Sequence, residues 1–84
     1  MITYFTEKDK ERTDIVWEVL GDESTEEIVV RAICNGKLYE KRKKSPVGYP
    51  TMIDRVFGID ESDLRMSYEM SNEIYTQVLE EESK

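Results

Sequence analysis

The dipeptide Asn35-Gly36 is the feature that most constrains the fold of this 84-residue chain. A two-residue type I′ turn needs positive φ at both central positions, and Asn followed by Gly meets that need at the lowest steric cost. The sequence therefore predicts a hairpin in which Glu27 to Cys34 pairs with Lys37 to Lys44. Strand alternation divides the side chains between a core face and an outward face. The expected core set is Ile28, Val30, Ala32, Cys34 and Tyr39, and the outward set is Val29, Arg31, Ile33, Leu38, Glu40 and Arg42.

The residues before this hairpin predict two further strands. Asp14 to Leu20 is rich in β-branched and aromatic residues, and Gly21-Asp22 follows it directly. This composition favours a strand that ends at Leu20 and pairs with the hairpin through a loop from Gly21 to Glu26. Ile2 to Thr6 then becomes the first strand, and Glu7 to Thr13 becomes a charged connection.

A helix is the alternative for the same region. Thr6 could N-cap a helix from Glu7 to Leu20, with Gly21 at its C-terminal end. We favour the strand because the first two turns of such a helix would be entirely charged and could not anchor to a core.

The second half of the chain predicts one short and one long helix. Pro46, Gly48 and Pro50 end the sheet region, since proline cannot donate to a strand ladder. Thr51 is a plausible N-cap for a short helix over Met52 to Phe57, with Gly58 as its C-cap. 

Asp60 starts the longer helix, and the acids of its first turn suit the positive end of the helix dipole. We expect Glu80 to Lys84 to fray. The apolar stripe of this helix is expected to consist of Leu64, Tyr68, Tyr75, Val78 and Leu79, widened by Met66, Met70 and Ile74.

Together these elements predict an α+β fold in a single domain over residues 1–84. The length is too small for a second core. We expect an antiparallel meander of three or four strands packed against one short and one long C-terminal helix. The residues expected in or next to the core include Trp17, Tyr39, Phe57, Leu64, Tyr68 and Tyr75.

The charges fall into three blocks. Glu7 to Glu27 holds 9 acids and 3 bases, Arg31 to Lys44 holds 1 acid and 6 bases, and Asp54 to Lys84 holds 9 acids and 3 bases. The chain as a whole has a formal net charge of −7. Such blocks predict a dipolar surface with a large negative field, which influences partners and association rates.

Several kinds of site are disfavoured by composition. The chain contains no histidine, which removes the commonest general base and transition-metal ligand. Cys34 is the single cysteine, and its position in the core set predicts a buried thiol. The acids from Asp60 to Asp63 lack the spacing of a calcium loop. We therefore expect no enzyme activity, no cofactor and no metal, in a cytoplasmic protein without a membrane span.

The run from Lys41 to Lys44 has two interpretations. It could bind phosphates, with Tyr39 and Tyr49 stacking on bases. We favour a role at an exposed strand edge, where the bases block aggregation and neutralise the acidic blocks. The net negative charge would repel a polyanion at long range.

Acidic side chains form two candidate partner-binding groups. Glu69, Glu73 and Glu80 fall on one face of the long helix, at intervals of roughly 6 and 10 Å along its axis. The second group surrounds the loop after the second strand and consists of Asp22, Glu23, Glu26 and Glu27.

In its short length, acidity and rows of acids, the chain resembles the small phage-encoded inhibitors that mimic DNA, including anti-CRISPR and host-takeover proteins. The resemblance is one of composition, and the run from Lys41 to Lys44 departs from it. It implies an inhibitor whose carboxylates replace phosphates on a basic nucleic-acid-binding protein of the host, with fast association and no direct contact with nucleic acid.

Two other functions remain open. One is a nucleic-acid-binding or regulatory module that uses Lys41 to Lys44. The other is a structural homodimer that pairs through the outward residues Val29, Ile33 and Leu38.

Overall fold

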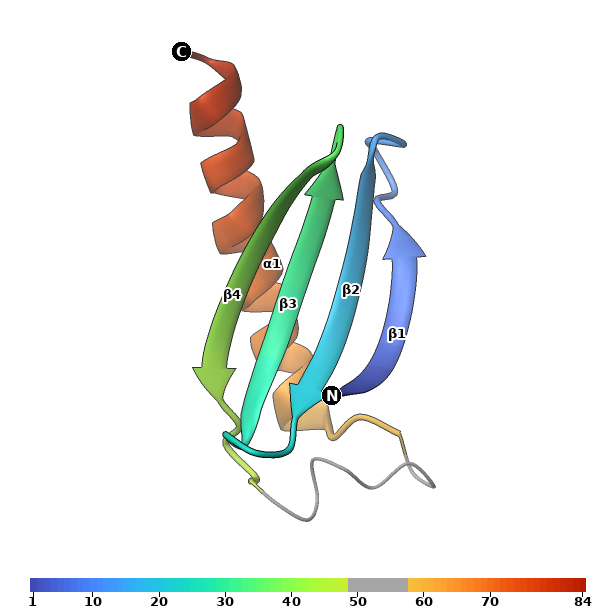
Figure 1. Ribbon diagram of the computed structural model, residues 1–84, viewed down its shortest axis with the longest axis vertical. Coiled ribbons are helices and arrows are strands. Elements are labelled where there is room, and N and C mark those ends of the chain that lie inside the picture. The colour runs from blue at the N-terminus through green and yellow to red at the C-terminus, as the bar shows by residue number, and fades with distance from the viewer. Residues whose placement is uncertain (49–57) are drawn as a thin grey trace.

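The described residues form a four-stranded antiparallel sheet and one long helix (Figure 1). The computed structural model describes residues 1–48 and 58–84. The strands are β1 (Ile2–Lys8), β2 (Ile15–Asp22), β3 (Glu27–Cys34) and β4 (Lys37–Lys44), and they lie side by side in chain order. The helix α1 (Glu61–Glu82) crosses one face of the sheet and packs on β3 and β4. The predicted α+β class and the antiparallel meander are confirmed.

The Asn35-Gly36 hairpin has the predicted register. Ile33 pairs with Leu38 and Arg31 pairs with Glu40. The φ angles of Asn35 and Gly36 are 51° and 81°, which is the left-handed backbone that this turn requires. The strand interpretation of Asp14 to Leu20 is also confirmed, because β2 pairs along its whole length with β3.

The β2–β3 turn lies later in the chain than predicted. β2 continues through Gly21 to Asp22, which pairs with Glu27. A Cβ atom on Gly21 would lie 3.0 Å from Cε2 of Tyr4, so the ring of Tyr4 occupies the space that a side chain would need. Gly21 is therefore a site of close packing within a strand and not the start of a turn.

The buried stripe of α1 agrees with the prediction in part. Asp63, Ser67, Met70, Ile74 and Val78 are its buried residues. Tyr68 and Leu79, predicted to face the core, are 56% and 47% exposed. Met70, Ile74 and Val78 are buried as predicted. The prediction was wrong for Tyr68 and Leu79, and in the first turns it followed the apolar residues, whereas the helix buries a carboxylate and a hydroxyl there.

The hydrophobic core lies between α1 and the inner face of the sheet. Trp17 and Tyr39 belong to it as predicted, and Tyr75 packs against it while partly exposed. Its other buried members are Ile15, Val19, Ile28, Val30, Ala32, Cys34, Met70, Ile74 and Val78.

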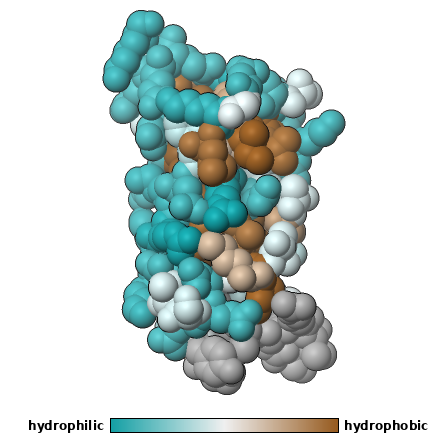
Figure 2. All heavy atoms as spheres, viewed as in Figure 1, coloured by the Kyte–Doolittle hydropathy of each residue, from teal (hydrophilic) through white to brown (hydrophobic). Residues whose placement is uncertain are grey.

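The outer face of the sheet mixes charge with a small apolar patch. Ile33 and Leu38 are exposed there as predicted, and apolar atoms are visible among polar ones on this face (Figure 2). Val29 was predicted to be exposed but is fully buried. Arg42 lies opposite Val29, and its guanidinium reaches Asp22 on β2, so its aliphatic stem crosses β3 beside Val29.

Two helix predictions remain to be placed. The short helix over residues 52–57, including Phe57, lies outside the described residues. The tail predicted to fray from Glu80 is helical as far as Glu82. Within the described ranges, no helix is long and apolar enough to cross a membrane.

The helix register can be tested by two truncations on α1. Ile74→Ala should lower the free energy of unfolding by about 2–5 kcal/mol, because it leaves a cavity in the core. Leu79→Ala, at an exposed position of the same helix, should change it by no more than about 0.5 kcal/mol. Chemical denaturation monitored by circular dichroism measures both. A larger loss for Leu79→Ala would contradict the observed register.

Candidate functional site

The basic residues of β4 bind acids on both faces of the sheet. On the inner face, Lys43 Nζ lies 2.9 Å from Glu73 Oε1, and Lys41 Nζ lies 3.7 Å from Glu73 Oε2. Lys37 Nζ lies 2.5 Å from Glu81 Oε2, and the Tyr39 hydroxyl donates a short hydrogen bond to the same oxygen. These contacts join the β4 edge to the C-terminal half of α1.

The outward residues of β4 hold the β2–β3 hairpin in the same way. Arg42 Nη1 lies 2.8 Å from Asp22 Oδ2 and 3.5 Å from Glu27 Oε1. Lys44 Nζ donates to the carbonyl of Thr25 at 2.8 Å and lies 3.9 Å from Glu26 Oε2. The four bases from residue 41 to residue 44 therefore alternate between the helix and the hairpin.

The predicted acidic residues fall into two groups, those that contact the bases of β4 and those that do not. Asp22, Glu26, Glu27 and Glu73 contact the bases of β4. The hydrogen bond from Arg42 lowers the pKa of Asp22, and that from Lys43 lowers the pKa of Glu73.

The other three predicted residues, Glu23, Glu69 and Glu80, are exposed. No ion pair joins them to any residue of 1–48 or 58–84. The predicted row on α1 is thus interrupted, because its central member Glu73 is bound to two lysines.

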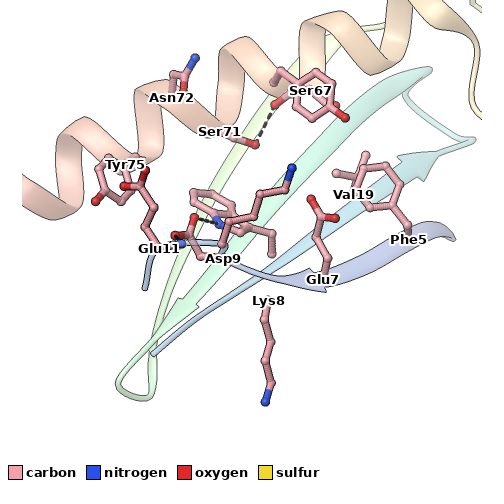
Figure 3. Close-up of a pocket in the computed structure, with 13 residues that line it drawn as sticks. Phe5, Glu7, Lys8, Asp9, Glu11, Val19, Ser67, Ser71, Asn72 and Tyr75 are labelled. Atoms are coloured by element: carbon pink, nitrogen blue, oxygen red, sulfur yellow. Dashed lines mark hydrogen bonds between the residues drawn. The ribbon is translucent and has the colours of Figure 1, made fainter. Parts of the chain in front are cut away.

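A groove that the sequence did not reveal lies between β1 and α1 (Figure 3). Its volume is about 430 Å³. The strands contribute Phe5, Trp17 and Val19, and the helix contributes small or aromatic side chains. The helix residues are Ser67, Tyr68, Ser71, Asn72 and Tyr75.

Charged residues of β1 and of the β1–β2 connection border this groove. They are Glu7, Lys8, Asp9, Lys10 and Glu11. Glu7 points toward the space between β1 and α1, whereas Lys8 points away from it (Figure 3). The border therefore presents more acidic than basic charge to the groove.

Hydrogen bonds hold the β1–β2 connection beside the groove. The Trp17 indole donates to Asp9 Oδ1 at 2.9 Å, and the backbone N–H groups of Glu11 and Arg12 donate to Asp9 Oδ2 at 3.0 and 2.9 Å. These bonds, led by the one from Trp17, lower the pKa of Asp9. Arg12 in turn donates to Glu82 near the end of α1. The β1–β2 connection is thus linked to the C-terminal end of α1.

Sequence reasoning missed the groove because its residues come from three distant segments. The signal that could have indicated it is Ser67 and Ser71, two small polar residues on the side of α1 that faces the sheet. Small side chains at these positions leave space that a Leu or Met would fill.

A second polar feature lies at the start of α1. Asp63 is fully buried, and its Oδ1 accepts a hydrogen bond from Ser45 Oγ at 2.7 Å. Its Oδ2 and the buried hydroxyl of Tyr4 have no hydrogen-bond partner among the described residues. Burial raises the pKa of Asp63, and burial together with Asp63 raises the pKa of Tyr4 to about 12. 

Replacing this carboxyl should change the pH dependence of stability. The folded state raises the pKa of Asp63 and so favours its protonated carboxyl. The stability that this preference contributes is complete below the unfolded pKa of about 3.9, and it is lost as pH rises through the folded pKa. Asp63→Asn should therefore be more stable than the wild type at pH 7, and the difference should shrink under acid conditions. Thermal denaturation across pH measures this, with Asp60→Asn as the control for loss of one charge. Equal pH profiles for wild type and Asp63→Asn would contradict the prediction.

Comparison with known proteins adds no family. No protein-family model, curated protein or solved structure matches the chain.

Proposed function

We propose that this protein is a non-catalytic binding protein that engages a basic segment of another protein through the groove between β1 and α1. The observation that carries the proposal is that the basic side chains of β4 form ion pairs with acids of the same chain. With those bases bound to Glu73, Glu81, Asp22 and Glu27, the strongest basic feature of the sequence is neutralised locally. Several exposed acids remain without an ion pair in the described part of the chain, namely Glu7, Glu11, Glu23, Glu69 and Glu80.

The groove has the size and chemistry of a ligand site. Its volume falls in the range of about 300–1,000 Å³ that is typical of such sites. The ring of Tyr68 is 56% exposed, and Phe5, Trp17 and Tyr75 lie in the same groove. Aromatic faces attract a Lys or Arg side chain through their quadrupoles, and Glu7 and Glu11 add charge attraction. A segment with a basic residue next to an apolar one fits both features.

The reactive groups of the chain argue against catalysis. Cys34 is buried, and burial together with the nearby Asp14 raises the pKa of its thiol. A raised pKa disfavours the thiolate, which is the nucleophilic form. The sequence also lacks histidine, the usual partner base.

DNA mimicry remains a second candidate. Glu69 and Glu80 are exposed on α1, as a mimic requires. The local charge is weaker than the sequence indicated, because Glu73 is bound to Lys41 and Lys43. The two candidates differ in the acids that they use, so they can be separated by matched substitutions.

The test selects ligands from a library of random displayed peptides and measures their affinity for two double variants. Glu7→Gln with Glu11→Gln alters the groove, and Glu69→Gln with Glu80→Gln alters the outer side of α1 by the same net charge. We expect the selected peptides to be enriched in Lys or Arg beside an apolar residue. The groove variant should bind them at least about tenfold more weakly, which corresponds to about 1.4 kcal/mol, and the helix variant should bind them nearly as well as the wild type. Fluorescence anisotropy at two salt concentrations gives the affinities.

Other outcomes would favour the alternatives. A loss confined to the helix variant would favour mimicry. An equal, small loss in both would mean that net charge alone attracts the peptides, which would contradict the groove as the site. A gel shift of duplex DNA or RNA by the protein alone would favour the nucleic-acid-binding module.

A further inference from the structure

The two edges of the sheet are built differently. β4, at one edge, carries five bases and binds α1 through its inward side chains. Lysines on an edge strand oppose pairing with another chain. β1, at the other edge, reads Ile-Thr-Tyr-Phe-Thr-Glu-Lys and is uncharged until Glu7. Its outward backbone groups make no hydrogen bond to any residue in the described ranges. Among residues 1–48 and 58–84, no strand pairs with the outer edge of β1, and Lys8 is its one basic residue.

One part of this edge is regular enough to pair with another strand. The β1–β2 ladder is irregular between Thr3 and Phe5. From Phe5 to Lys8 it is continuous, with Phe5 opposite Val19 and Lys8 opposite Val16. Phe5 and Glu7 therefore face α1, whereas Thr6 and Lys8 face the outer side, since successive side chains alternate.

We propose that a second copy of this chain pairs with β1 in antiparallel orientation, with the two-fold axis at Thr6. In a symmetric pair, residues directly opposite each other must lie on the same face of the sheet. An axis at Glu7 or at Lys8 would place like charges opposite each other. An axis at Thr6 places Thr6 opposite Thr6 of the second copy and Phe5 opposite Glu7, so it avoids both repulsions within the regular segment. Cross-strand Thr pairs are among the favourable ones.

In this dimer the grooves of the two copies would adjoin each other. Each groove lies between β1 and α1 and is lined by residues of β1. Pairing of the two β1 strands forms an eight-stranded sheet that carries both helices on one face. The two grooves then become one trough with a helix along each side, and each copy supplies half of its lining. This inference does not rest on the proposed peptide ligand.

The charge of the chain sets the expected salt dependence. Each copy has a net charge of −7, so the two copies repel each other at long range. Added salt screens this repulsion and should strengthen the dimer. Binding of a basic peptide in the groove should weaken with salt, so the two interactions respond in opposite directions. A single strand pair buries little surface, and we expect a dimer that dissociates in the micromolar range or above.

The first measurement is sedimentation equilibrium of the full chain over a range of protein and salt concentrations. The wild type should form a reversible dimer that salt strengthens. Thr6→Lys places two lysines opposite each other at the axis and should make the protein monomeric. Thr6 is exposed and lies opposite Glu18, so a lysine there should leave thermal stability near that of the wild type. Leu38→Lys, on the outer apolar patch, is the matched control and should not change the dimer.

The second measurement uses disulfide formation to test the register. Residues directly opposite in an antiparallel pair have Cα atoms about 4.5–5.5 Å apart, which is within the range for a disulfide. Thr6→Cys should therefore form a covalent dimer under mild oxidation much faster than Thr3→Cys, which does not oppose itself in this register. The native Cys34 is buried and should react slowly in both variants.

Three outcomes would overturn the inference. In the first, the wild type stays monomeric at all concentrations. In the second, Leu38→Lys dissociates the dimer and Thr6→Lys does not. In the third, the two cysteine variants crosslink equally fast. The second outcome would instead indicate a dimer through the outer apolar patch. None of these results depends on peptide binding, so failure of this inference is distinguishable from failure of the proposed function.

Discussion

Ion pairs join β4 to both the helix and the β2–β3 hairpin, and the position of α1 over β3 and β4 shapes the rest of the molecule. The inward bases of β4 bind Glu73 on the helix, and its outward bases bind the β2–β3 hairpin through Asp22 and Glu27. Each such exposed pair contributes only about 0.2–1 kcal/mol. Burial of apolar surface is not directional, so these pairs add a preference for α1 to lie over β3 and β4 instead of over β1 and β2. The helix lies on β3 and β4 and leaves β1 beside an open space.

The groove and the free edge are two consequences of this one-sided packing. A helix is about 10 Å across and neighbouring strands are about 4.8 Å apart, so one helix covers about two of the four strands. Trp17 and Val19 are still buried, since Phe5 and Tyr75 pack against the same core. What remains open is the space above β1, bordered by Glu7 and Glu11. A peptide ligand and a second copy would both act at this side of the molecule.

Local chemistry allowed much of the fold to be predicted. The Asn35-Gly36 turn set the register of β3 and β4, and Asp60 begins the long helix by accepting a hydrogen bond from the Ser62 N–H. The predictions that failed depended on long-range packing. Val29 alternates to the outer face and yet is buried beside the stem of Arg42, and Tyr68 is apolar and yet exposed. Neither environment can be read from neighbours in the chain.

The sequence by itself determined the hairpin, the order of the elements and the three charge blocks, because these depend on turn geometry, alternation and counting. Only the tertiary structure decided which acids are bound to bases, since Glu73 and Lys43 are 30 residues apart and meet only when the helix docks. It also decided that Ser67 and Ser71 face the sheet beside Trp17, which creates the groove. The physical reason is that ion pairing and cavity shape depend on distances across the fold, whereas turns and strands depend on neighbouring residues.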